Sequence, residues 1–196
     1  KNPRTVLIGD SHIDQLFPRF VENNDEKFSK VISIGAGNCP PLILPKYGER
    51  CIKQIRHTLQ NLKLYPNLEF AIISSWNLPY GNPEKAIKGF KPVVEKLLNK
   101  GLKIAIIVDN PTLKLDPRNC NLAWPAVKLL ISKPPEYCTS PTLDDFEPYV
   151  NYKNFIKKFK KLYPDIFVFD PLSIFCKGSV CKIRSGKIMN YSDEGH

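Results

Sequence analysis

The chain has 196 residues, 42% of them hydrophobic, and carries a formal net charge of +10. This length suits one well-buried domain and is too short for two comfortable ones. The longest apolar runs, at residues 71–73 and 104–108, have the length of strands, so no membrane-spanning helix is predicted. The excess positive charge comes mainly from lysine, which on most surfaces only interacts with solvent.

A buried strand over residues 4–8 opens the chain and runs into Gly9-Asp10-Ser11-His12. A strand that ends in a glycine turn puts Ser11 where the strand passes into a helix. That is the usual place of an exposed nucleophile on an open α/β sheet. We expect the helix to run from about His12 to Val21. Asp10 is expected to support the turn through hydrogen bonds to the backbone, and His12 to cap or pack the helix without transferring protons.

Strands and helices then alternate, which predicts a mainly parallel sheet wrapped by helices. Further strands are expected at residues 30–34, 68–74, 102–108 and 166–169, and helices at 48–62 and 83–100, the latter ended by Gly101. Residues 110–148 are rich in proline and irregular, typical of an insertion over the rim of the sheet, with one short helix around Ala126 to Ile131. Two short arms, at 181–183 and 187–189, are expected to turn at Ser185-Gly186.

The densest basic segment, Asn154 to Lys161, has apolar residues spaced three and four apart from Tyr152 to Leu162. This pattern predicts an amphipathic helix with lysines on its outer face. Its aromatic residues belong to the core, whereas nucleic-acid binding needs exposed aromatics and arginine, so we expect no nucleic-acid partner. Contact with an anionic glycolipid or membrane surface fits the charge better.

The six cysteines fall into three sequential pairs, and each pair brackets a loop rich in proline or glycine. We therefore predict the disulfides Cys39–Cys51, Cys120–Cys138 and Cys176–Cys181, and an oxidising compartment; free buried thiols are the alternative. No metal site is expected, because no CxxC is present and the histidines lie far from the cysteines.

Near the C-terminus, Asp193 and His196 are three residues apart, a spacing at which a carboxylate can reach the imidazole and fix its tautomer. Together with Ser11 they provide the three groups of a nucleophilic triad. The chain therefore reads as a serine-dependent acyl-handling domain. It has no initiator Met, and a catalytic His is rarely a natural last residue, so we expect it to be part of a longer protein.

The two end motifs, Gly9-Asp10-Ser11-His12 and Asp193-x-x-His196, resemble the first and last blocks of the SGNH hydrolase superfamily. The chain is more closely similar to the SGNH domain fused behind the membrane-embedded acyltransferase-3 family. That likeness rests on Asn38-Cys39-Pro40-Pro41-Leu42, Ser74-Ser75-Trp76-Asn77, Asp170-Pro171, Cys176 to Ile183, Ser185-Gly186-Lys187 and Tyr191-Ser192-Asp193. The resemblance implies one domain over residues 1–196, folded as a three-layer α/β/α sandwich of the flavodoxin-like kind. It also implies a periplasmic location at the bacterial inner membrane.

The activity implied by the resemblance is O-acyl transfer, with acetyl the commonest cargo, to a surface glycan such as lipopolysaccharide O-antigen. A fused transmembrane acyltransferase domain would deliver the acyl group, and this domain would need no cofactor. Ser11 would attack the acyl carbonyl, His196 would take its proton, and Asp193 would orient His196.

An oxyanion hole is implied at the Ser11 backbone N–H and at that of Gly35 or Gly37. Its third donor in the superfamily is an asparagine after the third strand, but the usual Gly-x-Asn-Asp block is absent here. Either Asn77 supplies the amide, or Trp76 occupies that position and leaves two donors.

Trp76, Tyr80 and Tyr191 are candidates for a rim that stacks on sugar rings, with core packing as the alternative. Two other functions stay open on the sequence. One is a carbohydrate esterase, in which water resolves the same acyl-serine; the other is a glycan-binding module without turnover.

Overall fold

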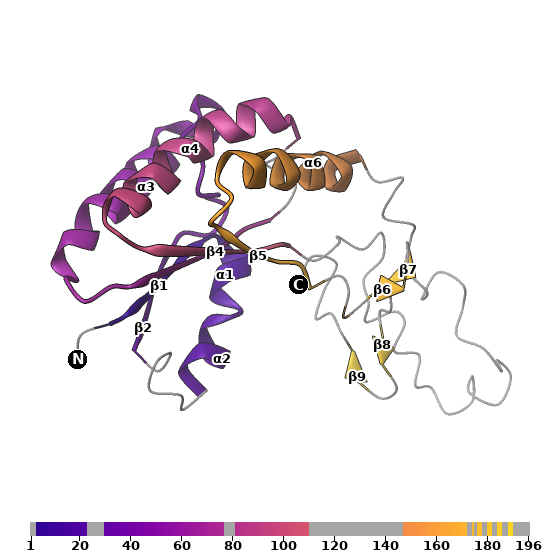
Figure 1. Cartoon of the computed structure of the whole chain (residues 1–196), viewed down its shortest axis with the longest axis horizontal. Helices are drawn as coiled ribbons and strands as arrows, with labels where there is room; N and C mark the ends of the chain where they lie inside the picture. The colour runs from indigo at the N-terminus through magenta and orange to yellow at the C-terminus, as the bar shows by residue number, and fades with distance from the viewer. Residues whose placement is uncertain are drawn as a thin grey trace, which may run out of the picture.

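The computed structural model describes residues 3–22, 30–76, 81–109 and 147–171, with 174, 176–177, 180–181, 184–185 and 188–189. A five-stranded sheet of order β2-β1-β3-β4-β5 forms its centre, and every neighbouring pair is parallel (Figure 1). The strands are β1 (Thr5–Gly9), β2 (Val31–Gly35), β3 (Phe70–Ser74), β4 (Lys103–Ile107) and β5 (Phe167–Phe169). The parallel sheet expected from the sequence is confirmed.

Helices cover both faces of this sheet (Figure 1). On one face lie the short helices α1 (Ser11–Asp14) and α2 (Phe17–Glu22), and on the other lie α3 (Gly48–Asn61), α4 (Pro83–Asn99) and α6 (Glu147–Leu162). Single 3₁₀ turns at Pro45–Tyr47 and Leu62–Leu64 flank α3. The arrangement is the three-layer α/β/α sandwich that the family resemblance implies. None of the helices in the described ranges is long and apolar enough to cross a membrane.

The core is divided by the sheet because successive side chains of a strand point to opposite faces. Along β1, Val6 and Ile8 join the large cluster under α3, α4 and α6, whereas Leu7 joins a small cluster with Ile13 and Ile72 under α1. The large cluster is built around packed aromatic rings of α4 and α6, namely Phe90, Tyr152, Phe155 and Phe159. Both faces of the central strands are therefore dry, as a parallel sheet requires.

The first helix differs from the sequence prediction. Where one helix was expected over about residues 12–21, the chain forms α1 and α2, separated at residues 15–16. Pro18 explains the break, because it has no backbone N–H and its ring clashes with the carbonyl of the residue four positions earlier, here Asp14. A helix that begins at Ser11 must therefore end within its first turn.

The boundaries of α4 agree with the predicted range, whereas α6 begins at Glu147, five residues before the predicted apolar pattern starts at Tyr152. Asn82 caps α4 by accepting a hydrogen bond from the Lys85 backbone N–H at 2.9 Å, and Pro83 occupies the first turn. Gly101 follows with a φ of +82°, a conformation that favours glycine at a helix end. In the tail, residues 176–177 pair with 180–181 and 184–185 pair with 188–189, both antiparallel. The tail therefore has two antiparallel pairs where one was expected, and residues 188–189 pair with 184–185 instead of 181–183. The short helix expected at 126–131 lies outside the described residues.

Candidate active site at the carboxyl edge of the sheet

Ser11 stands at the first position of α1, directly after β1 and Asp10. In the strand order β2-β1-β3, the connections from β1 and β3 leave on opposite faces of the sheet (Figure 1). Such a reversal opens a crevice outside the carboxyl ends of the strands, where α/β proteins of this order bind their ligands. The fold therefore places Ser11, the predicted nucleophile, at the carboxyl edge of the sheet beside this crossover.

Asp10 is buried and holds the turn that carries Ser11. Its Oδ1 accepts a hydrogen bond from the His12 backbone N–H at 3.0 Å and caps α1. Its Oδ2 accepts from the Trp76 backbone N–H, also at 3.0 Å, and so joins the end of β1 to the segment after β3. The expected support of the turn by Asp10 is confirmed.

Glycines let the three strand ends approach one another. Gly9 lies beside Gly35 of β2 and Ser74 of β3 in the sheet register. A Cβ on Gly9 would lie 1.8 Å from the Ser74 carbonyl oxygen, and a Cβ on Gly35 would lie 2.7 Å from the Gly9 carbonyl oxygen. Gly35 thus lies directly beside β1, whereas Gly37 lies two residues further on, with no atom near the position of a Cβ. Their roles in an oxyanion hole stay predictions.

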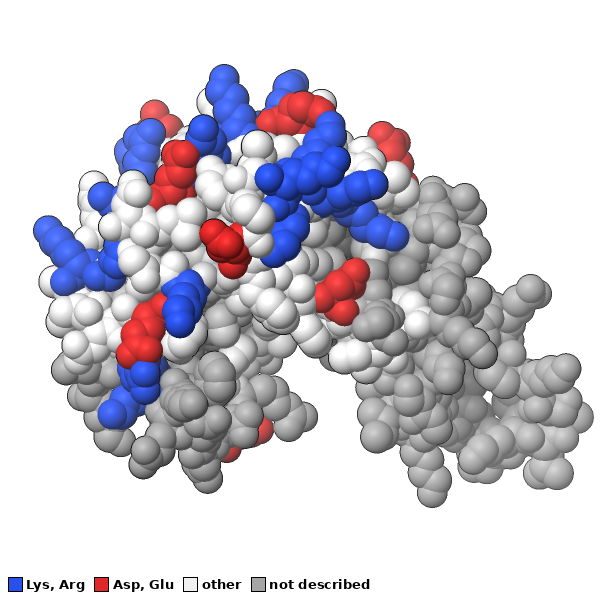
Figure 2. Space-filling model, viewed as in Figure 1, with Lys and Arg blue, Asp and Glu red and all other residues white. Residues whose placement is uncertain are grey.

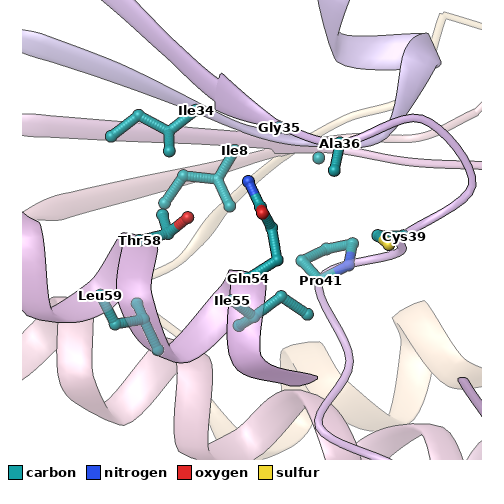
Figure 3. A pocket seen from close by; sticks show the side chains of 11 residues that line it. Ile8, Ile34, Gly35, Ala36, Cys39, Pro41, Gln54, Ile55, Thr58 and Leu59 are labelled. Atoms are coloured by element: carbon teal, nitrogen blue, oxygen red, sulfur yellow. The ribbon is translucent and has the colours of Figure 1, made fainter. Parts of the chain in front are cut away.

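A small cavity lies below these glycines, between the sheet and α3 (Figure 3). Side chains of β1, β2 and α3 form most of its wall, the side chain of Gln54 points into it, and Cys39 and Pro41 lie at its loop side. Its volume is about 10 Å³, space for about one water molecule. It is a packing gap behind the site, too small for an acyl substrate.

The loop after β2 is fixed by the Cys39–Cys51 disulfide, which joins it to α3 and confirms the predicted bridge. Cys176 is also disulfide-bonded and stands opposite Cys181 in the antiparallel pair of the tail, as the predicted Cys176–Cys181 bridge requires. Cys120 and Cys138 lie outside the described residues.

A contact that the sequence did not predict lies beside Ser11. The imidazole Nδ1 of His12 is 2.6 Å from Oδ1 of Asp109, and both side chains are buried. The His12 ring also stacks on Trp76, with centroids 6.4 Å apart and 18° between the planes. The expected packing role of His12 therefore holds, but its partner is a carboxylate 97 residues away. One feature of the sequence could have indicated this contact. Asp109 comes two residues after an apolar strand, and the end of that strand lies at the same edge of the sheet as Ser11.

Several predicted site residues lie outside the described residues: Asn77, Tyr80, Tyr191, Asp193 and His196. Of the predicted rim, only Trp76 lies in the described ranges. It is half-buried, its backbone N–H donates to Asp10, and its ring stacks on His12. Among the described residues, no group of three or more His, Cys, Asp or Glu is arranged to hold a metal ion.

The lysines of α6 lie on its outer face, as the amphipathic pattern predicted. Lys157, Lys158, Lys160 and Lys161 are exposed, while Phe155 and Phe159 are buried. Figure 2 shows basic side chains gathered over this helix. Part of this charge is compensated, because Lys158 pairs with Glu84 of α4 and its hydrogen bond lowers the pKa of that carboxyl group.

A flavodoxin-like α/β sandwich with Gly-Asp-Ser at the end of its first strand has the architecture of a serine esterase or acyl-transfer enzyme. Residues 1–196 match the family model described as the SGNH domain fused to AT3 domains, and the chain belongs to that family. A search of curated protein sequences finds no significant match.

Two solved structures show the same fold. The periplasmic domain of a lipopolysaccharide acetyltransferase from Salmonella ser. Paratyphi A superposes with a TM-score of 0.73 at 17% identity, covering 100% of this chain and 78% of that one. A GDSL-like lipase from Bacteroides thetaiotaomicron VPI-5482 superposes with a TM-score of 0.52 at 12% identity, covering 98% of this chain and 78% of that one. The chain is thus similar to both a transferase domain and a lipase.

Proposed function

We propose that this domain transfers an acyl group, most simply acetyl, to a bacterial surface glycan such as lipopolysaccharide O-antigen. The observation that carries the proposal is Ser11 at the carboxyl end of β1, held by the Asp10 cap, in a chain of the family fused to AT3 domains. The similarity to a lipopolysaccharide acetyltransferase periplasmic domain supports the glycan acceptor and a periplasmic location at the inner membrane.

The reaction proceeds in two halves. Ser11 Oγ forms a bond to the acyl carbonyl carbon while His196 takes the hydroxyl proton, and collapse of the tetrahedral intermediate expels the donor, which receives that proton. A glycan hydroxyl then gives its proton to His196 and attacks the acyl-serine, and Ser11 leaves with the proton returned. Asp193 orients His196 throughout. The fused membrane domain supplies the acyl donor, and this domain uses no cofactor.

The tetrahedral intermediate carries its charge on the former carbonyl oxygen. Backbone N–H groups of Ser11 and of Gly35 or Gly37, with Asn77 as third donor, would stabilise it by about 3–4 kcal/mol each. The close register of Gly9 and Gly35 supports the choice of Gly35, because it brings the end of β2 beside the nucleophile strand.

A carbohydrate O-acetyl esterase is the second candidate, favoured by the fold shared with a GDSL-like lipase. Both reactions pass through acyl-Ser11 and differ in what resolves it: a sugar hydroxyl or water.

The experiment is intact-mass spectrometry of the purified protein after exposure to p-nitrophenyl acetate, with and without a rhamnose- or glucose-containing glycan. We expect one acetyl adduct, absent from Ser11→Ala, that the glycan discharges faster than water does. An adduct discharged at the same rate with and without glycan would make the protein an esterase. A wild type that forms no adduct, like Ser11→Ala, would contradict acyl-serine chemistry and leave a glycan-binding module.

A further inference from the structure

The triad reaction makes no use of the buried pair His12–Asp109, which lies one residue from the nucleophile. The side chains are 8% and 3% exposed, and Nδ1 and Oδ1 are 2.6 Å apart. An ionised carboxylate only accepts hydrogen bonds, so Nδ1 carries the proton that it donates to Asp109. A bond this short between buried groups is charge-assisted and directional.

The pair joins two strands that are not neighbours in the sheet. His12 follows β1 and Asp109 follows β4, while β3 lies between them. The space over the end of β3 is taken by Trp76, whose ring stacks on His12 and whose backbone N–H is bound by Asp10. The first turn of α1 is therefore held from two sides, by Trp76 after β3 and by Asp109 after β4.

Stability alone does not explain a polar pair at this place. A buried ion pair is often no more stabilising than two well-packed apolar side chains, since both groups lose their hydration. A directional hydrogen bond does what apolar packing does not: it fixes the rotation of the ring and of the helical turn that carries it. Ser11 belongs to that same turn, so its Oγ and its backbone N–H move with His12.

We propose that His12 is a positioning residue, held by Asp109, that sets Ser11 in the geometry required for acyl transfer. The inference rests on the proposed function. It does not make His12 the general base. The Nδ1 of His12 is hydrogen-bonded to Asp109, and the ring is buried. Successive side chains on a helix point about 100° apart, so the His12 imidazole and the Ser11 hydroxyl point in different directions.

The test compares two amides at position 12 in the full-length protein. The amide nitrogen of Asn occupies the place of Nδ1, so His12→Asn keeps a donor toward Asp109. Gln is one methylene longer and carries its amide at the place of Nε2, so His12→Gln loses that donor at nearly the same size and polarity. Single-turnover release of p-nitrophenolate is measured at a series of p-nitrophenyl acetate concentrations, and its limiting rate constant and half-saturating concentration are taken as kcat and KM. Each rate is expressed per reactive Ser11, counted by labelling with a fluorophosphonate until labelling is complete. Unfolded protein is thereby excluded from the comparison.

We expect His12→Gln to lower kcat about 100-fold with KM unchanged, because a displacement of about 1 Å at the nucleophile costs that much. His12→Asn should stay within about tenfold of the wild type. Asp109→Asn, which keeps an acceptor oxygen for Nδ1–H, should behave like His12→Asn, and Asp109→Leu like His12→Gln.

Three results would overturn the inference. His12→Gln with the wild-type rate would show that the pair does not position Ser11. His12→Asn as inactive as Ser11→Ala would show that the imidazole itself takes part in the reaction. A rise in KM at constant kcat would assign His12 to substrate binding. Failure of the acyl-serine chemistry looks different, because then the wild type itself releases no p-nitrophenolate; an esterase outcome is recognised separately, by discharge of the adduct at the same rate with and without glycan.

Discussion

The two edges of the sheet each carry an ion pair with a nitrogen–oxygen distance of 2.6 Å, in very different surroundings. At the amino edge, Arg4 and Glu69 precede β1 and β3, and their side chains are 38% and 48% exposed. At the carboxyl edge, His12 and Asp109 are 8% and 3% exposed. Geometry alone does not separate the two pairs. Burial does. When an exposed pair breaks, both groups are hydrated by solvent, whereas a broken buried pair leaves a charge without water or partner.

The carboxyl edge is also the more tightly packed of the two. Gly9 lies against the backbone of β3, and Asp10 fixes the next turn. At the amino edge, by contrast, Arg4, Lys30 and Glu69 line an open surface hollow of about 500 Å³. Changes at the carboxyl edge should therefore have large effects, and changes at the amino edge small ones.

The largest effect is expected from Gly9→Ala. Its Cβ would lie 1.8 Å from the Ser74 carbonyl oxygen, a backbone atom that moves only if β1 and β3 separate. We expect a loss of about 3 kcal/mol or more in the free energy of unfolding, or no folded protein. Urea denaturation followed by circular dichroism measures it.

Gly37→Ala is the matched control, since nothing lies within 4 Å of its Cβ position and its φ is not in the left-handed region. It should change stability by no more than about 0.5 kcal/mol. Equal denaturation midpoints for the two variants would contradict the close approach of β1 and β3.

The next effect concerns the disulfide at the carboxyl edge. Cys39 and Cys51 close a loop with a sequence separation of 12, so the double change Cys39→Ala/Cys51→Ala should cost about 3 kcal/mol. Reduction of the wild type should lower its stability at least as much, because it also opens the disulfide of Cys176. A melting temperature that does not respond to either treatment would mean that the loop after β2 is held by its packing alone.

Local patterns in the sequence were sufficient for most of the fold. Apolar runs located the strands, Pro83 and Gly101 located the ends of α4, and proximity gave the Cys39–Cys51 bridge. The break of the first helix was missed although Pro18 signals it, because the apolar spacing on both sides continues a helical pattern.

The site was predicted less completely, since its contacts join distant segments. Asp10 was recognised because it acts within its own turn, whereas Asp109 acts 97 residues from His12. Its partner depends on the order of strands in the sheet, and that order is settled by packing and not by local spacing. An aspartate directly after a buried strand indicates a residue at the carboxyl edge of the sheet. It does not indicate which other strand end that residue will contact.

The smallest effect is expected at the amino edge, from the pH dependence of the Arg4–Glu69 pair. The hydrogen bond from Arg4 lowers the pKa of the Glu69 carboxyl group. A carboxyl group with a lowered folded-state pKa stabilises the fold above its ordinary value, and this stabilisation is lost as the pH falls through the lowered value. Glu69→Gln should therefore remove a shallow acid-side slope from the stability curve and leave the activity at Ser11 unchanged.

Solvent and salt should weaken even that slope, because both side chains are well exposed. The measurement is the urea midpoint of wild type and Glu69→Gln across the acid range, at low and at high salt. The two curves should differ slightly at low salt and coincide at high salt. A salt-independent loss in Glu69→Gln as large as that from removing the Cys39–Cys51 disulfide would show that exposure does not separate the two edges.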